Sequence, residues 1–193
     1  SELQHDRARE ALKSHGLESS LEISSCGDVP GNTGLGSSGS YLVALLNGIR
    51  HYTKRPCSPG IVAEEACQIE INKLGYPVGK QDQYIAAHGG FKCFDFPANP
   101  EHNTAVKDVN ISASNTLALI NNLHIYYLKK KRNASSILKE QNSNNPSNEE
   151  KLLKVKEMGY KTIDFLESGN FDDYGLLLDE YWSLKKQFSE KMS

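Results

Sequence analysis

The chain carries a stretch rich in glycine and serine, Asn32-Thr33-Gly34-Leu35-Gly36-Ser37-Ser38-Gly39-Ser40, which leads directly into an apolar segment that begins at Tyr41. In that segment Leu42, Leu45, Leu46 and Ile49 recur at helical spacing, which predicts a helix with one buried face. Glycines let a backbone approach an anion closely, and the first N–H groups of a helix have no partner within it. We therefore expect a phosphate-binding loop at the start of this helix, made of Gly34, Leu35, Gly36, Ser37, Ser38 and Gly39.

The length and the charge of the chain limit which kinds of ligand are expected. The sequence has 193 residues, enough for one ordinary domain or two small ones. Its 22 Lys and Arg residues nearly balance 24 Asp and Glu residues, so neither nucleic acid nor an anionic membrane is an expected partner. No signal peptide and no apolar run long enough to cross a bilayer is visible, which favours a cytoplasmic protein. A small molecule is the expected ligand.

The sequence of residues 2–75 predicts mainly helices. A polar helix is expected over residues 2–15, and the alternation of Leu21-Glu22-Ile23-Ser24 predicts a short strand before the glycine loop. After the loop helix, Ser58 as N-cap and Pro59 at the first helical position predict a further helix, which Gly75 should end. The four cysteines are far apart and show no metal-site spacing, which indicates reduced thiols.

From Gly89 onward the pattern changes to segments rich in aromatic and β-branched residues. These predict strands over residues 91–96, 106–111 and 124–128, and the Asn- and Ser-rich tract at 141–148 predicts a mobile loop. Apolar spacing then predicts one helix that ends at Gly169-Asn170 and another from Phe171 to Phe188.

A second polar cluster, Gly79-Lys80-Gln81-Asp82-Gln83-Tyr84, follows the Gly75 stop. With Ser38 upstream and Glu70 on the intervening helix, the chain holds a glycine cradle, a hydroxyl and two carboxylates, which are the parts that phosphoryl transfer needs. Structural alternatives stand beside this hypothesis: Ser38 as a plain N-cap, Glu70 as a solvated helix residue and Asp82 as a turn former.

The glycine loop also satisfies the dinucleotide pattern G-x-G-x-x-G between Gly34 and Gly39. That fingerprint should directly follow a buried strand and precede an acidic residue at the end of the next strand. Here a turn-like segment precedes the loop and a helix follows Pro59, so a nicotinamide- or flavin-binding domain is the weaker interpretation.

The two clusters together resemble the GHMP kinases, a superfamily of small-molecule kinases. The segment 34–40 is similar to the family's Gly-Leu-Gly-Ser-Ser motif, and 79–83 to its Gly-x-x-Asp-Gln segment. Within the superfamily the chain is most similar to the bacterial D-glycero-D-manno-heptose 7-phosphate kinases. That similarity rests on Cys57-Ser58-Pro59, Ala63-Glu64-Glu65-Ala66, Gly89-Gly90-Phe91, Arg132-Asn133-Ala134-Ser135-Ser136-Ile137-Leu138 and Trp182-Ser183-Leu184-Lys185-Lys186.

The resemblance implies an α+β fold. It implies a ribosomal protein S5-like left-handed βαβ arrangement in an ATP-binding portion at residues 1–100, and a ferredoxin-like portion at 101–193. Both portions are expected to be incomplete, because the family's first motif and its third, glycine-rich motif do not appear in the sequence. The chain is therefore expected to be a fragment or a truncated relative.

The resemblance also assigns roles to residues. Ser38 and Glu70 would be Mg²⁺ ligands, and Asp82 would be the general base that takes the proton of a sugar hydroxyl as it attacks the γ-phosphate of ATP. Lys80, Gln83 and Arg132 are further candidates for holding the sugar phosphate, although the basic run that ends at Arg132 could equally be a solvated strand end. The expected reaction is phosphorylation of a phosphorylated heptose at its anomeric hydroxyl. The alternative is an inactive module that binds nucleotide or sugar phosphate.

Overall fold

The structure is a computed structural model that describes residues 3–17, 19, 21–28, 34–99, 103–126 and 146–188, with side chains of the last range described from Asn148 onward. The chain divides into two compact units. The described residues up to Gly90 belong to the first, and those from Phe91 onward to the second. The division into domains at 1–100 and 101–193 stays a prediction. No helix in the described part of the chain is both long enough and apolar enough to cross a membrane.

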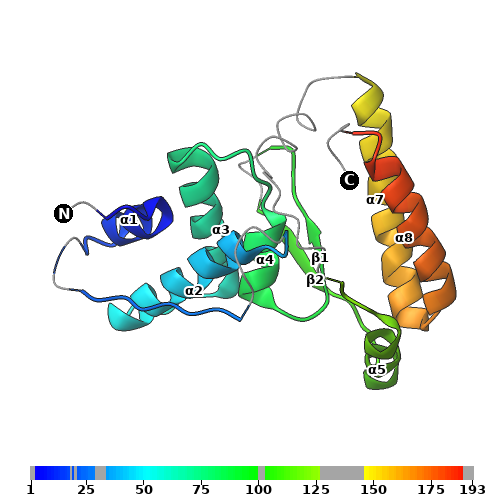
Figure 1. Cartoon of the computed structure of the whole chain (residues 1–193), viewed down its shortest axis with the longest axis horizontal. Coiled ribbons are helices and arrows are strands. Elements are labelled where there is room, and N and C mark those ends of the chain that lie inside the picture. Colours follow the sequence, from blue (N-terminus) through cyan, green and yellow to red (C-terminus); the bar gives the residue numbers. More distant parts are fainter. Residues whose placement is uncertain are drawn as a thin grey trace. The chain divides into compact units, whose positions relative to one another are not determined.

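The first unit is built from helices (Figure 1): α1 (Asp6–Ser14), α2 (Ser37–Tyr52), α3 (Pro59–Cys67), the π-helical turn η1 (Gln68–Lys73) and α4 (Gln81–His88). Helices α2, α3 and α4 pack against one another, and α1 packs on α2 and η1. The predicted helices around residues 2–15 and after the glycine loop are confirmed. The shared core contains the expected face of α2 together with residues of α1, α3 and η1. Its members are Ala8, Ala11, Leu42, Val43, Leu45, Leu46, Ile49, Val62, Ala66 and Ile69.

Local signals set the ends of α3 and η1. Ser58 is the N-cap and Pro59 opens the helix, as the sequence predicts. Gly75 adopts a left-handed φ of 67°, and the Tyr76 N–H donates to the Glu70 carbonyl oxygen at 2.9 Å, which closes the helix end. The π-helical turn contains Glu70, and such turns often occur at functional sites.

The second unit contains a two-stranded antiparallel sheet and three helices in its described part. Strand β1 (Lys92–Asp95) pairs with β2 (Ala105–Asp108), with Lys92 opposite Asp108 and Asp95 opposite Ala105. Helix α5 (Ala113–Asn122) follows, and α7 (Pro146–Ser168) packs on α8 (Phe171–Lys185). Val109, Leu119 and Leu166 form a small core.

Several predictions for the second unit need correction. Helix α5 was not predicted; Ser112 caps it by accepting a hydrogen bond from the Asn115 N–H, and this cap lies between two segments that resemble strands. Residues 124–126 form no strand, and the rest of that predicted strand lies outside the described residues. The loop predicted at 141–148 is wrong for residues 146–148, because α7 begins at Pro146. The rest of that loop lies outside the described residues. The last two predicted helices are confirmed.

The fold mixes many helices with few strands, which agrees with the α+β class only at that coarse level. The left-handed βαβ and ferredoxin-like arrangements are not confirmed. The predicted strand at Leu21–Ser24 is wrong, because segment 21–28 has no strand structure. A strand needs a neighbouring strand to complete its backbone hydrogen bonds, and the described residues of the first unit provide none.

Candidate functional site

The glycine loop ends in a tight turn that starts α2. Gly34 and Gly36 have left-handed φ angles of 80° and 69°, and Gly36 is the N-cap residue. Ser37, Ser38 and Gly39 form the first turn of the helix, and among the described residues no side-chain hydrogen bond caps it at Gly36. Ser38 is therefore a residue of the first turn and not the plain N-cap of the structural alternative. This uncapped helix start can accept an anion.

The carboxylate of Asp82 lies directly against this turn. Asp82 belongs to the first turn of α4, which packs on α2. A Cβ atom added to Gly36 would lie 3.2 Å from Asp82 Cγ, and one added to Gly39 would lie 3.0 Å from Asp82 Cβ. Gly39 is buried, so its missing side chain is what lets the two helices approach here.

The electrostatic setting of Asp82 suits a proton acceptor. Asp82 as a residue is exposed, and it makes no ion pair with any residue that the structure describes. Packing of its carboxyl against protein atoms raises its pKa above the ordinary Asp value, and the negative charge of Glu70 raises this pKa further. The carboxylate is therefore more basic than a free one and still reachable from solvent.

Glu70 is the centre of a buried polar cluster. Its side chain is 0% exposed, so the alternative of a solvated helix residue is wrong. Arg7 Nε donates to Glu70 Oε1 at 2.7 Å, and Gln83 Nε2 donates to Glu70 Oε2. Gln83 Oε1 is buried and has no hydrogen-bond partner among the described residues. The guanidinium of Arg7 also lies over the Tyr76 ring, 4.6 Å from its centroid.

Of the residues predicted to hold the sugar phosphate, Lys80 is bonded to Glu64, outside the Glu70 cluster, and Gln83 belongs to that cluster. Lys80 Nζ donates to both carboxylate oxygens of Glu64, at 3.0 and 3.1 Å, and Tyr84 Oη donates to Glu64 Oε2 at 2.9 Å. Burial alone would raise the pKa of Glu64, but these hydrogen bonds outweigh it, and the pKa is lowered. Gln83 is only 2% exposed. Arg132 lies outside the described residues.

A cavity of about 960 Å³ borders the glycine loop. One wall is a face of α2 and the other is the extended segment 21–28; Leu35, Ser37 and Ser40 line it near the loop. Its volume lies in the range of small-molecule sites. The sequence did not predict this cavity: Leu21 to Ser24, part of its wall, was predicted as a strand.

The part of the chain that carries these residues is similar to known proteins. Residues 5–90 match the model of the GHMP kinases N terminal domain, and this range includes the glycine loop, Glu70 and Asp82. Residues 5–90 are thus similar to a GHMP kinase N-terminal domain. The predicted resemblance is thereby confirmed.

The chain is also 28% identical over 178 residues to the D-glycero-alpha-D-manno-heptose 7-phosphate kinase of Campylobacter jejuni. The alignment covers 90% of this chain and 51% of the relative, so the chain spans about half the length of the curated relative it matches.

The chemistry of the oxygen atoms around Glu70 bears on whether the region at residues 5–90 suits Mg²⁺. In its described part, no group of three or more His, Cys, Asp or Glu side chains is arranged to hold a metal ion. Mg²⁺ in nucleotide sites, however, is held by one or two protein oxygens together with phosphates and water. Glu70 already holds a cationic group, Arg7, and Gln83 Oε1 beside it is an oxygen acceptor without a donor. These hard oxygen ligands fit the ion.

No local pattern marked Arg7 as a site residue. Its partner Glu70 lies 63 positions further along the chain. A buried acid such as Glu70 requires a counter-charge, which is the physical signal that could have prompted the search.

Proposed function

We propose that the chain is an ATP-dependent sugar kinase domain that phosphorylates the anomeric hydroxyl of a phosphorylated heptose or a related sugar. The observation that carries this proposal is the placement of Asp82 against Gly36 and Gly39 at the uncapped start of α2. This placement supports a base beside a bound phosphate, because the carboxylate lies next to a helix start that suits an anion. The heptose phosphate kinase of C. jejuni supports the choice of sugar.

In the proposed reaction the amides at residues 37–39 hold the nucleotide's phosphates. Asp82 takes the proton of the sugar hydroxyl while that oxygen forms a bond to the γ-phosphorus and the bond to the ADP oxygen breaks. The raised pKa of Asp82 favours this step, because a more basic carboxylate accepts the proton more readily. Mg²⁺, held by Ser38 and Glu70, would neutralise phosphate charge when bound.

The cavity beside the loop is the proposed place for the rest of the nucleotide. Its lining is mainly apolar, and Ser37 at the start of α2 is one of the lining residues. Lys80, Gln83 and Arg132 remain proposed contacts for the sugar phosphate. Because Lys80 Nζ is paired with Glu64 and Gln83 Nε2 with Glu70, these two donors would have to exchange partners to reach a ligand, whereas Gln83 Oε1 has no partner among the described residues.

The second candidate is a module that binds nucleotide or sugar phosphate without transferring phosphate. Such a module needs only the anion-binding start of α2 and no base. Both candidates need anion binding at residues 34–39. They differ in what Asp82 does.

Asp82→Asn separates the two candidates. If the chain is a kinase, this change removes the base and lowers ATP-dependent phosphorylation of heptose 7-phosphate by about 10²- to 10⁴-fold, while ATP binding is retained. The measurement is coupled ADP release for rate and calorimetry for binding. Asp172→Asn is the matched control, because Asp172 is also an acid in the first turn of a helix, α8.

Other results would exclude the kinase proposal. ATP binding without any phosphate transfer by the wild-type chain would support the binding module. A rise in melting temperature with NAD but not with ATP would point to a dinucleotide site.

A further inference from the structure

The carboxylate of Glu70 is already neutralised within the chain. Its side chain is completely buried, and Arg7 Nε lies 2.7 Å from Oε1. A buried carboxylate is costly unless a positive charge compensates it. Arg7 supplies that charge from the first turn of α1, and Gln83 engages the other oxygen.

A divalent cation bound to Glu70 would compensate the same negative charge that Arg7 compensates now. An Mg²⁺ ligand oxygen lies about 2.0–2.1 Å from the metal, closer than a guanidinium nitrogen approaches a carboxylate. Both Glu70 oxygens have hydrogen-bond donors, so a cation that reaches Oε1 must take the place of Arg7 or lie beside its positive charge. In either arrangement the guanidinium of Arg7 and the metal ion compete for the Glu70 carboxylate or repel each other.

The guanidinium of Arg7 has other interaction partners besides Glu70. Nη1 of Arg7 is 3.9 Å from Asp6 Oδ1, and the guanidinium lies over the Tyr76 ring. Tyr76 in turn donates to Asp6 Oδ2. A guanidinium released from Glu70 would therefore keep a carboxylate and an aromatic face as partners.

We propose that Arg7 is the resident counter-charge of Glu70 and competes with the divalent cation for this carboxylate, so that α1 sets the cation affinity of the site. The inference rests on the proposed role of Glu70 as a metal ligand. It predicts that the site is weak for cations while Arg7 holds Glu70. Arg7 is thus a positioning residue and not a catalytic one.

The test uses the whole 193-residue chain with Mn²⁺ as probe and no nucleotide. Free Mn²⁺ is measured by electron paramagnetic resonance. Arg7→Met should tighten Mn²⁺ binding by about 10- to 100-fold, the equivalent of one charged hydrogen bond. Arg7→Lys, which keeps the charge, should bind Mn²⁺ nearly as weakly as the wild type. Arg9→Met is the matched control on α1, because Arg9 pairs with Glu10 and not with Glu70.

Glu70→Gln distinguishes the proposed role of Glu70 as a metal ligand from the proposed competition by Arg7. Should this variant weaken Mn²⁺ binding while Arg7→Met leaves it unchanged, Glu70 is a ligand but the competition does not exist. Should Glu70→Gln leave Mn²⁺ binding unchanged, the proposed metal role of Glu70 fails, and the inference about Arg7 fails with it. Weaker binding by Arg7→Met would also overturn the inference.

A stability measurement covers the case in which Arg7→Met folds poorly. Without metal this variant leaves Glu70 uncompensated and should melt at a lower temperature than the wild type. Mn²⁺ should then raise its melting temperature, followed by circular dichroism, by more than it raises that of the wild type. If the variant stays unfolded at every Mn²⁺ concentration, a divalent cation cannot replace Arg7 and the inference is wrong.

Discussion

Gly39 controls how closely the carboxylate of Asp82 approaches the glycine loop. An added Cβ would lie 3.0 Å from Asp82 Cβ and 3.3 Å from the backbone of Asp82 and Gln83. Backbone atoms cannot rotate away as a flexible side chain can, so α2 or α4 would have to move. The position therefore links packing directly to the geometry of the proposed base.

We expect Gly39→Ala to destabilise the chain by about 1–3 kcal/mol, the usual effect of overpacking, and to lower phosphate transfer. Urea denaturation measures the first effect and ADP release the second. Gly48→Ala is the control in the same helix, because nothing lies within 4 Å of an added Cβ there. It should be neutral or stabilising by up to about 1 kcal/mol, since Ala favours helix more than Gly does. Equal effects of the two changes would contradict the close approach.

The raised pKa of Asp82 predicts a dependence of stability on pH. The folded state disfavours the ionised carboxylate, so the native group holds its proton to a higher pH than the unfolded one does. Asp82→Asn removes this penalty and should melt at a higher temperature than the wild type at pH 7. The difference should shrink as the pH falls through the raised pKa towards the ordinary Asp value of 3.8.

Thermal melts of both proteins across the acidic range test this prediction. Asp172→Asn should give no such gain, because an acid near a helix N-terminus is favourable. A lower melting temperature for Asp82→Asn at pH 7 would show that Asp82 stabilises the fold and is not a strained functional group.

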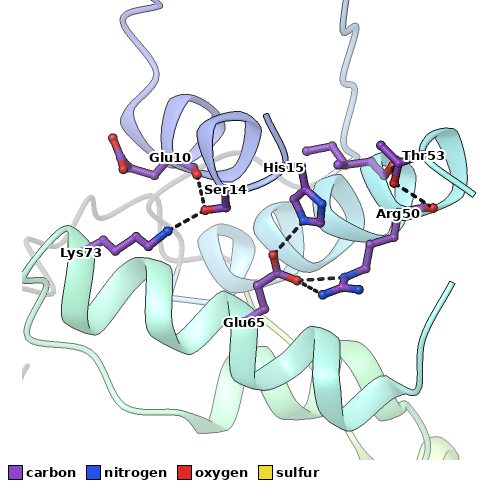
Figure 2. A network of polar contacts seen from close by, with 8 residues as sticks. Glu10, Ser14, His15, Arg50, Thr53, Glu65 and Lys73 are labelled. Atoms are coloured by element: carbon purple, nitrogen blue, oxygen red, sulfur yellow. Dashed lines mark hydrogen bonds and ion pairs between the residues drawn. The ribbon is translucent and has the colours of Figure 1, made fainter. Parts of the chain in front are cut away.

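At the scale of elements, Glu65 connects three helices of the first unit (Figure 2). His15, the C-cap of α1, lies 2.8 Å from Glu65 Oε1, and Arg50 of α2 donates twice to Oε2 at 2.8 and 2.5 Å. Lys73 of η1 donates to Ser14 Oγ at 2.6 Å, which adds a second link to α1. These contacts fix α1 on the helices that carry Glu70 and the glycine loop.

We expect Glu65→Gln to lower the free energy of unfolding by about 1–3 kcal/mol, because Arg50 and His15 lose a charged acceptor in a partly buried place. Chemical denaturation provides the measurement. Glu150→Gln is the comparison, since Glu150 also pairs with one cation, Lys154, but lies exposed on α7. Its stability should stay unchanged within error. A similar small effect of both changes would show that the network contributes little.

At the scale of the whole molecule, each of the two units has a core among its described residues, and these cores differ in size. Among the described residues, the cluster around α2 in the first unit contains ten buried apolar residues, and the cluster around Leu119 in the second contains three. The apolar spacing of Leu42, Leu45, Leu46 and Ile49 predicted the larger core correctly. Helix α5 was missed because only Leu119 of that helix is buried, so apolar spacing gave little signal there.

What the sequence by itself determined is local. The glycine loop before α2, the Ser58-Pro59 helix start and the Gly75 stop depend on neighbouring residues and on backbone angles that glycine and proline favour. The tertiary structure alone decided that Asp82 meets Gly36 and that Arg7 neutralises Glu70. Those contacts join residues far apart in the chain, and they form only when burial of the shared core brings α1, α2 and α4 together.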